Sequence, residues 1–573
     1  MKIQFLSLDS NVWPHNLSQT ILIDRFKSVG AELTRVFCNG FLSGSCIPLS
    51  ELEQSGRLSK SELKKLCNAC QSRSALVTKK ASVHSLFLDN YLDSELFSDY
   101  SSQLNYVDEE NWFDFKIDEI LVGRIAAYEF FLKHKISDLV IPSQLFNEYR
   151  ENLQNTLKVV ASVHNIISDT RPDVVISYNA SYSFNNAYSQ FAKHYGARTY
   201  SIQGGSHIIE RGKTLSLYES TKDLIGVPFG KDWQKVKSKF PSISDVQKSL
   251  DHFAGLVTGE SPWAYSGSLE KKNPKVKLGI NNDNYTILAL TSSEDEIFAA
   301  KMIEMLPENP LPNAFTSQLD FVQCVLEMAS VKTEWNFVIR LHPRLLPNKR
   351  DDKTALGLKD LYKLLEAKSE NVYVNFPTDE ISIYDLYANV DVGLNYRSSA
   401  GYEMMACGIP VVTCISKDYF PGPIDGMQYG ESVGEVMNLL ETARRTGPNL
   451  ENAVIAYRWW GFLFNKCAQP IAVESPVSVT KIRPKRSKSM IKIWRYLVRF
   501  IQLYLPMIRE RLDLKHLNSN FVDDRFTEVL EKGLVGLSAC ADTAQGDEDS
   551  DLIHSKRVMT QIRLMIGLQP LHN

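Results

Sequence analysis

The chain has 573 residues, of which 44% are hydrophobic, 23% charged and 10% aromatic. This composition is that of an ordinary globular protein, and it excludes a single small domain and a disordered, collagenous or disulfide-scaffold chain. The 64 Lys and Arg residues against 67 Asp and Glu residues leave a formal net charge of −3, which argues against a nucleic-acid-binding protein.

The start of the chain has the pattern of a β-strand rather than of a targeting signal. Asp9 interrupts the apolar run too early for a signal peptide, and no small-residue cleavage site follows it. No uncharged apolar run approaches the roughly 20 residues that span a bilayer. The nine Cys residues, an odd number, fit reduced thiols better than a disulfide framework. We therefore expect a cytoplasmic protein.

Residues 1–265 alternate strand-like and helix-like patterns, as in a doubly wound α/β domain. We expect strand 3–8, helix 18–29, strand 32–38, helix 149–168, strand 173–178, helix 185–195 and strand 197–202. The last strand runs into the loop Gln203-Gly204-Gly205-Ser206-His207. Because such domains bind ligands at the carboxyl ends of parallel strands, we expect this loop to face a substrate.

A polar linker is indicated around 259–277, and residues 275–450 repeat the βαβ pattern. Here we expect strand 285–290, helix 319–329, strand 335–341, strand 371–376, helix 383–388 and strand 390–394. Two Rossmann-like domains facing across a cleft make the GT-B architecture, which is the α/β fold that we predict.

The end of the chain differs in kind. We expect 451–475 to be a helix that crosses back to the first domain, and 476–573 to be a helical extension. Within it, 481–511 interleaves Lys and Arg with apolar residues, as in a helix that lies on an anionic membrane surface. A solvated helix packed on the second domain is the alternative. The acidic run 547–551 predicts a loop before a last helix at 555–566.

The run Arg340-Leu341-His342-Pro343-Arg344 follows a predicted strand. Proline fixes its own φ and restricts the residue before it, so His342 is held rigidly. Such a histidine can donate to a phosphate oxygen, and Arg340 and Arg344 would add the fork geometry that suits phosphate. A satisfied histidine at a strand end is the alternative interpretation.

A second run, 395–412, combines a strand end, a polar loop and a helix start. Ser399 can cap the helix, and the small residues Ala400 and Gly401 let backbone amides approach an anion. Glu403, one turn into the helix, is placed to accept both hydroxyls of a ribose, or simply to complement the helix dipole.

Together with Thr291-Ser292-Ser293, these runs resemble bacterial surface-polysaccharide (capsule or O-antigen) glycosyltransferases of GT-B fold. The resemblance covers the second domain. It implies a donor site for a CMP-, UDP- or GDP-sugar, in which Arg340, His342, Ser398, Ser399 and Glu403 contact the nucleotide part and Thr291, Ser292 and Ser293 line the phosphate side; Arg344 is the further candidate from the first run. In the first domain the likeness is confined to strand-loop pairs, including Gly204 and Gly205, on the side of the acceptor and sugar.

The resemblance further implies a surface-polysaccharide or lipid-linked glycan as acceptor, at the inner face of the cytoplasmic membrane. We expect no cofactor. Because no Asp-x-Asp motif lies in a strand-end loop, we also expect the leaving phosphate to be stabilised without a metal.

Other functions stay open. The retaining pattern Glu-x7-Glu needs a Glu where this chain has Asn395, and the His-Pro and Ser-Ser runs also resemble transferases of CMP-activated acidic sugars. The alternatives are a phosphotransferase that uses a CDP-polyol, and a non-enzymatic, degenerate GT-B protein that joins a membrane assembly through 481–511.

A base for the acceptor hydroxyl should come from the first domain. The candidates are Asp9 and His15 after the first strand, His207 and Glu210 after the glycine turn, and the acidic loop with Asp108, Glu109, Glu110 and Asp114. We favour His207 and Asp9.

Four cysteines, Cys38, Cys46, Cys67 and Cys70, lie close together in the sequence and end in a Cys-x2-Cys pair. Four thiolates can hold a structural Zn²⁺. Free buried thiols are the alternative, because the spacing of the first pair is loose.

Overall fold

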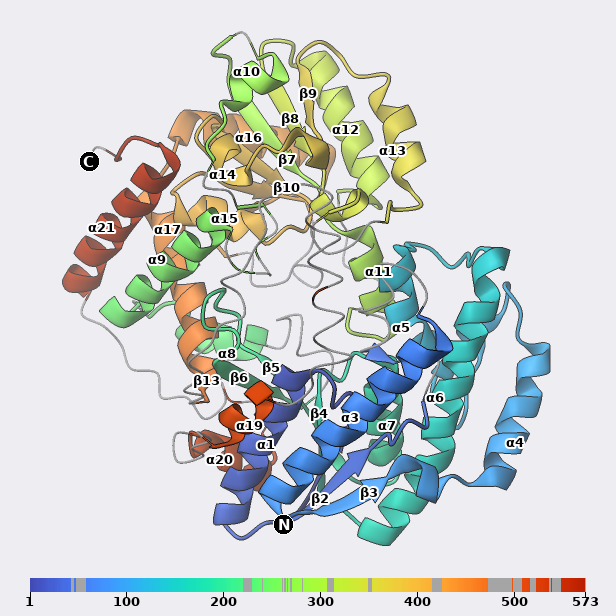
Figure 1. Ribbon diagram of the computed structural model, residues 1–573. Helices are drawn as coiled ribbons and strands as arrows, with labels where there is room; N and C mark the ends of the chain where they lie inside the picture. The colour runs from blue at the N-terminus through green and yellow to red at the C-terminus, as the bar shows by residue number, and fades with distance from the viewer. Residues whose placement is uncertain are drawn as a thin grey trace.

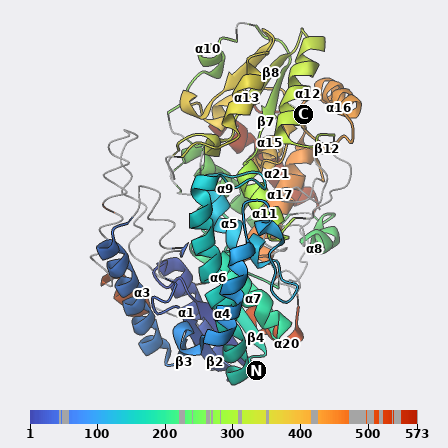
Figure 2. The same cartoon turned by 90° about the vertical axis from the view of Figure 1, so that its right-hand side faces the viewer.

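The computed structural model describes residues 1–42, 46–47, 58–219, 229–239, 241–259, 261, 264, 266–267, 270–280, 282–306, 314–348, 353–414, 425–471, 497, 508–515, 522–534, 537 and 548–571. These residues form two α/β units, each built on its own sheet, with helices on the faces of both sheets (Figures 1 and 2).

The first sheet has the strand order β13-β6-β5-β4-β1-β2-β3. Its strands are β1 (Lys2–Ser7), β2 (Glu32–Phe37), β3 (His84–Phe87), β4 (Val174–Tyr178), β5 (Arg198–Gly204), β6 (Thr214–Tyr218) and β13 (Gln469–Pro470). Strands β1 to β5 are parallel, and β6 pairs antiparallel with β5. Strand order reverses between β1 and β4, which is the point where doubly wound sheets bind ligands.

The second sheet has the order β12-β11-β10-β7-β8-β9, with all neighbours parallel. Its strands are β7 (Thr286–Leu290), β8 (Asn336–Arg340), β9 (Val372–Asn375), β10 (Val392–Asn395), β11 (Val411–Thr413) and β12 (Gln428–Tyr429). The order is again Rossmann-like, with its switch point between β7 and β10. The α/β fold with two Rossmann-like units is therefore as predicted, and each predicted strand is present within about two residues.

Helices cover both sheets (Figure 1). Their bounds are α1 (Trp13–Ser28), α3 (Lys60–Ala81), α4 (Ser94–Gln103), α5 (Val122–His134), α6 (Ser143–Thr170), α7 (Ser183–His194), α8 (Phe229–Val236), α9 (Ile243–Thr258), α10 (Pro274–Leu278), α11 (Glu294–Met302), α12 (Gln318–Val331), α13 (Leu358–Leu365), α14 (Ile383–Tyr387), α15 (Ala400–Ala406), α16 (Val433–Thr446), α17 (Leu450–Gly461), α19 (Ile508–Lys515), α20 (Arg525–Lys532) and α21 (Glu548–Ile566).

Three helices, α1, α6 and α21, begin well before their predicted start, and α6 begins at Ser143 rather than at residue 149. Helix α1 begins at Trp13 rather than at residue 18, because Pro14 occupies the first turn, where its missing N–H costs no hydrogen bond. Helix α21 begins at Glu548, so the acidic run belongs to the helix and not to a loop. Acidic residues suit a helix N-terminus because they complement its dipole.

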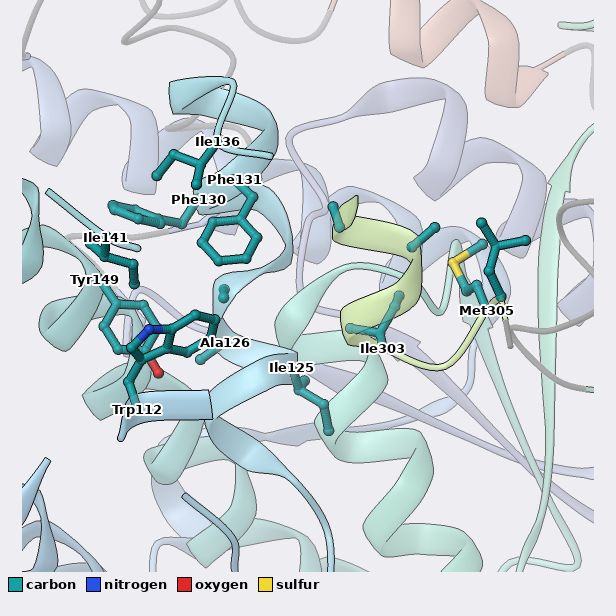
Figure 3. Packing of buried hydrophobic residues seen from close by; sticks show 14 of the residues in the cluster. Trp112, Ile125, Ala126, Phe130, Phe131, Ile136, Ile141, Tyr149, Ile303 and Met305 are labelled. Atoms are coloured by element: carbon teal, nitrogen blue, oxygen red, sulfur yellow. The ribbon is translucent and has the colours of Figure 1, made fainter. Parts of the chain in front are cut away.

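The two units share a hydrophobic core where α5 of the first meets α11 of the second. The rings of Phe131 on α5 and Phe298 on α11 lie 5.4 Å apart. Figure 3 shows Ile125, Phe130 and Phe131 of α5 on one side of this region and Ile303 and Met305 beyond α11 on the other. Continuous packing of this kind fixes how the two sheets face each other.

After the second sheet the chain returns to the first. Helix α17 packs on α9, α15 and α21, a π-helical turn follows at Phe462–Lys466, and β13 then pairs with β6. Helices α19 and α20, later in the chain, lie beside α1 (Figure 1). Within the described residues, no helix has both the length and the apolar character that a bilayer span needs.

Candidate functional site

A cavity of about 260 Å³ opens where β7, β8 and β10 end, at the switch point of the second sheet. The loops after these strands and helix α11 line it, through Ser292, Ser293, Glu296, Ile297, Ala300, Leu306, His342, Arg397, Ser398 and Ser399. Five of the residues predicted for the donor site are therefore neighbours in space: Ser292, Ser293, His342, Ser398 and Ser399.

His342 is a neutral hydrogen-bond donor in this cavity. Burial, followed by the charge of Arg344, lowers the pKa of His342 to about 3. Its Nδ1 accepts the backbone N–H of Arg344 at 3.3 Å, which assigns the ring proton to Nε2. The backbone N–H of His342 donates to Thr291 Oγ1 at 2.9 Å. The ring is thus held in one orientation and one tautomer.

The loop after β10 brings two hydroxyls and a guanidinium to the same cavity. Ser398 Oγ accepts the backbone N–H of Ala400 at 3.3 Å, so its own proton can turn to a ligand. Arg397 lies over the ring of Tyr396, 5.2 Å from the centroid, and has a φ of 147°. Strained backbone of this kind persists where the surroundings enforce it, and it clusters at binding sites.

The serine loop after β7 is already engaged within the protein. Ser292 Oγ donates to the carbonyl of Arg397 at 3.4 Å, and Ser293 Oγ donates to Asp295 at 2.9 Å. Thr291 Oγ1 donates to the carbonyl of Arg340, behind the cavity wall. The two serines therefore present lone pairs rather than protons to the cavity, and Thr291 supports His342.

The two predicted arginines, Arg340 and Arg344, are not among the residues that line the cavity, and their guanidinium groups bond within the protein. Arg340 Nη1 donates to Asn375 and to the carbonyl of Ile381 at 3.0 Å. Arg344 pairs with Asp295 and donates to the carbonyl of Leu132, on α5, at 3.2 Å. Alternation along the strand could not predict this, because both side chains turn to carboxylate, amide or carbonyl partners distant in the sequence.

Glu403 lies within α15, one turn from Ser399. Its Oε2 accepts the hydroxyls of Tyr384 at 2.9 Å and Tyr387 at 3.4 Å, and its Oε1 accepts none from the described residues. Burial raises the pKa of Glu403 to about 7, although both tyrosine hydroxyls favour its ionised form. Glu403 is not among the residues that line the cavity, so the structure gives it two tyrosine partners and a position one turn behind Ser399.

In the first unit, Asp9 and His15 come together at the carboxyl end of β1, beside the switch point. His15 Nδ1 lies 2.5 Å from Asp9 Oδ2, and the His15 ring stacks on Tyr178 at 3.8 Å. A carboxylate can only accept, so Nδ1 carries the proton, and Nε2 keeps its lone pair. Among the described residues, no hydrogen bond engages His15 Nε2. A histidine oriented by a carboxylate is the arrangement of a general base.

His207 does not join this pair. Its Nε2 contacts the carbonyl of Lys248 at 3.1 Å, its Nδ1 accepts the N–H of Glu210, and Phe464 packs on its edge. With both nitrogens engaged by the main chain, His207 is a packed histidine, and its assignment as a base is not supported. The residue that pairs with Asp9 is His15, which was also among the candidate bases. Its position six residues after Asp9, across the turn into α1, is the sequence feature that favours it.

The glycine turn owes its composition to close packing. A Cβ on Gly204 would lie 2.6 Å from the carbonyl oxygen of Arg211, and one on Gly205 would lie 2.3 Å from Thr214 Oγ1. These glycines let β5 and β6 approach each other, and neither lines the cavity at the switch point of the second sheet.

Tyr128 of α5 interacts with residues of both units. It hydrogen-bonds Ser181, in the loop after β4, and lies in the electrostatic field of Glu296 and Arg344 of the second unit. Helix α5 therefore lies beside the loop after β4 of the first unit and beside Glu296 and Arg344 of the second.

The predicted zinc site is not assembled. Cys38, Cys67 and Cys70 are near enough to affect one another's pKa values, and burial raises the pKa of Cys38 to about 11 and that of Cys70 to about 12. Within the described ranges, no three His, Cys, Asp or Glu side chains are grouped so as to hold a metal ion. The arrangement fits the free-thiol alternative, since these thiols are not grouped with a third ligand in the part of the chain that the structure describes.

Two further predicted features are the acidic loop that begins at Asp108 and the basic stretch 481–511. In the acidic loop, Asp108 accepts the backbone N–H groups of Glu110 and Asn111, as in a local turn. The basic stretch 481–511 lies outside the described residues except for Leu497 and the start of α19.

No protein-family model matches the chain, and no curated protein matches its sequence. Solved structures do align with it. A putative UDP-N-acetylglucosamine 2-epimerase from Listeria monocytogenes aligns over 85% of this chain and 99% of its own, with 10% identity and a TM-score of 0.27. The KpsC beta Kdo 2,7 transferase of Thermosulfurimonas dismutans aligns over 59% and 88%, with 11% identity and a TM-score of 0.32. The glycotransferase of kitacinnamycin aligns over 80% and 95%, with 12% identity and a TM-score of 0.22. Similarity this distant assigns no activity, which has to be argued from the site.

Proposed function

We propose that the protein is a glycosyltransferase that moves a sugar from a nucleotide-activated donor to a glycan acceptor. The donor cavity is the observation that carries the proposal. It combines a neutral histidine N–H, serine hydroxyls and Arg397 at the switch point of a parallel sheet, where phosphate groups bind. Its volume of about 260 Å³ suits the phosphates, and Glu403 Oε1 is the proposed acceptor for the ribose hydroxyls.

The proposed reaction joins the two units. The acceptor hydroxyl oxygen bonds to the anomeric carbon, the bond from that carbon to the phosphate oxygen breaks, and the hydroxyl proton passes to His15 Nε2. Asp9 stabilises the imidazolium that forms. The electron pair of the broken bond stays on the nucleotide phosphate, where the His342 N–H and Arg397 stabilise it.

The proposed acceptor is a surface-polysaccharide or lipid-linked glycan, and the stretch 481–511 is the proposed contact with an anionic membrane. We also propose that no metal takes part, so that excess chelator leaves transfer unchanged. A CDP-polyol phosphotransferase would instead place phosphorus in the product, which mass spectrometry of the product distinguishes.

Nucleotide binding tests the donor site. In a thermal-shift screen of CMP, UDP, GDP and CDP, one nucleotide should raise the melting temperature, because a ligand that binds only the native state stabilises it. His342→Ala should weaken that nucleotide about 10- to 100-fold by calorimetry, since a hydrogen bond to a charged group is worth about 1.5–3 kcal/mol. If no nucleotide binds, or if the variant binds as wild type does, the donor site is wrong.

The base is tested separately. Asp9→Asn and His15→Gln should each lower kcat about 100-fold or more, as general bases contribute about 10²–10⁴-fold, while the affinity for the nucleotide stays at the wild-type value. Full transfer activity in both variants would rule out this pair as the base.

A further inference from the structure

The short helix α19, near the end of the chain, lies against α1 and α3 of the first unit (Figure 1). Two of its acidic residues are buried: Glu510 is 7% exposed and Asp513 is 3% exposed. Carboxylates are rarely buried unless they are paired, because losing water is costly for a charge. Their partners show what the helix holds in place.

Glu510 is tied to the loop that follows β1. Arg73 on α3 donates to Glu510 Oε1 from Nε at 3.1 Å and from Nη2 at 2.7 Å, and its Nη1 donates to Asn11 Oδ1. Arg73 is only 4% exposed. Asn11 stands two residues after Asp9, so this buried pair fixes one side of the loop.

Asp513 fixes the other side. Its Oδ2 accepts the indole N–H of Trp13 at 2.7 Å, and Trp13 stands two residues before His15. The loop itself is a tight turn, in which the Val12 N–H donates to the Asp9 carbonyl at 2.8 Å and the His15 N–H donates to the Val12 carbonyl at 3.0 Å. Asp9 and His15 are therefore the two ends of a turn whose middle is held by a segment roughly 500 residues further along the chain.

We propose that α19 is the positioning element of the Asp9–His15 pair, with Asp513 and Glu510 as its positioning residues. The proposal rests on the proposed function in so far as the pair is the base. It assigns the C-terminal extension to the acceptor half of the reaction: weakening α19 lowers proton transfer and leaves nucleotide binding intact, because the donor cavity shares no residue with these contacts.

A matched control is a second carboxylate near the end of the chain that pairs with α1, just before α20 rather than on α19. Arg25, near the C-terminal end of α1, pairs with Asp524, whose side chain is 87% exposed. Asp524→Ala and Asp513→Ala each remove one carboxylate that joins the end of the chain to α1, but only Asp513 touches the loop. Trp13→Phe removes the indole N–H from the other partner and keeps an aromatic ring, so it guards against misfolding of the Asp513 variant.

The experiment is hydrogen–deuterium exchange of the full chain, read on peptides that cover residues 8–17. Asp513→Ala and Trp13→Phe should each speed exchange there at least 10-fold, and Asp524→Ala should not. In a transfer assay with the nucleotide sugar selected by the thermal-shift screen, the first two variants should lose kcat 10-fold or more with the nucleotide Kd unchanged.

The two proposals fail differently. Wild-type exchange in the Asp513 and Trp13 variants, or equal effects in the Asp524 variant, would overturn the role of α19 whatever the protein catalyses. Faster exchange with unchanged kcat would show that α19 orders the loop without serving the reaction, and would overturn the positioning role. Failure of every nucleotide to bind wild type would instead overturn the proposed function.

Discussion

At the residue scale, the Nδ1 partners of His15 and His342 leave the Nε2 atoms of the two rings with opposite hydrogen-bonding roles. Asp9 accepts from His15 Nδ1, which leaves Nε2 as a proton acceptor. The Arg344 N–H donates to His342 Nδ1, which leaves Nε2 as a proton donor. Burial holds the pKa of His342 near 3, so this ring stays neutral at any working pH. A single neighbour thus decides whether a histidine accepts or gives a proton.

Glu403 should give nucleotide binding its pH dependence. Its carboxylate accepts ribose hydroxyls best when ionised, and burial raises its pKa to about 7. The Kd for the nucleotide should therefore fall as the pH rises from about 6 to 8, while His342 contributes nothing in that window. Glu403→Gln should bind more weakly at pH 8 and show a flat profile by calorimetry. A profile in the variant that matches wild type would contradict this.

At the scale of elements, the contact between α5 and α11 holds the units together. Arg344, 9% exposed, pairs with Asp295, at the start of α11, and donates to the carbonyl of Leu132 on α5. The guanidinium of Arg344, in the loop after β8, thus bonds to both α11 and α5 and links the two units. This is a structural use of a residue that the motif alone assigns to phosphate.

Removal of the Arg344 guanidinium should lower the free energy of unfolding rather than the affinity for the nucleotide. Arg344→Met leaves the Asp295 carboxylate buried without its partner, and breaking a buried pair costs about 3–5 kcal/mol. Denaturant unfolding should show a loss of this order, and Asp295→Asn in the same chain should recover part of it. A stable single variant with lost nucleotide affinity would restore Arg344 to the phosphate site.

At the scale of the whole molecule, burial raises the pKa of carboxyl groups in both units. Burial raises the pKa of Glu129, on α5, and that of Glu403 to about 7, from 4.5 for an unburied glutamate. Between pH 4.5 and pH 7 these carboxyl groups bind more protons in the folded state than in the unfolded state. They therefore favour folding more as the pH falls from 7 toward 4.5.

The prediction concerns the difference in unfolding free energy between wild type and a Glu129 variant. Glu129→Gln removes one of these groups, so between pH 7 and 5 its unfolding free energy should rise less than that of wild type, by at most about 3 kcal/mol. Urea titrations at pH 5, 6 and 7 measure this difference. Parallel curves for the two proteins would show that Glu129 ionises normally.

The amino-acid pattern by itself determined the two Rossmann-like units, the order of their strands along the chain and the gathering of His342, Ser398 and Ser399 at one cavity. Hydrophobic period and turn chemistry are local, and the carboxyl ends of neighbouring parallel strands always meet at one edge.

Only the tertiary structure decided three features. Arg340 bonds to the carbonyl of Ile381 and Arg344 to Asp295, His15 rather than His207 pairs with Asp9, and α19 contacts the loop between Asp9 and His15. The partners of Arg340, Arg344 and α19 lie tens to hundreds of residues away, and the choice of His15 over His207 depends on the main-chain contacts that engage both nitrogens of His207. Which buried polar groups satisfy each other is settled by packing, and no local pattern records it.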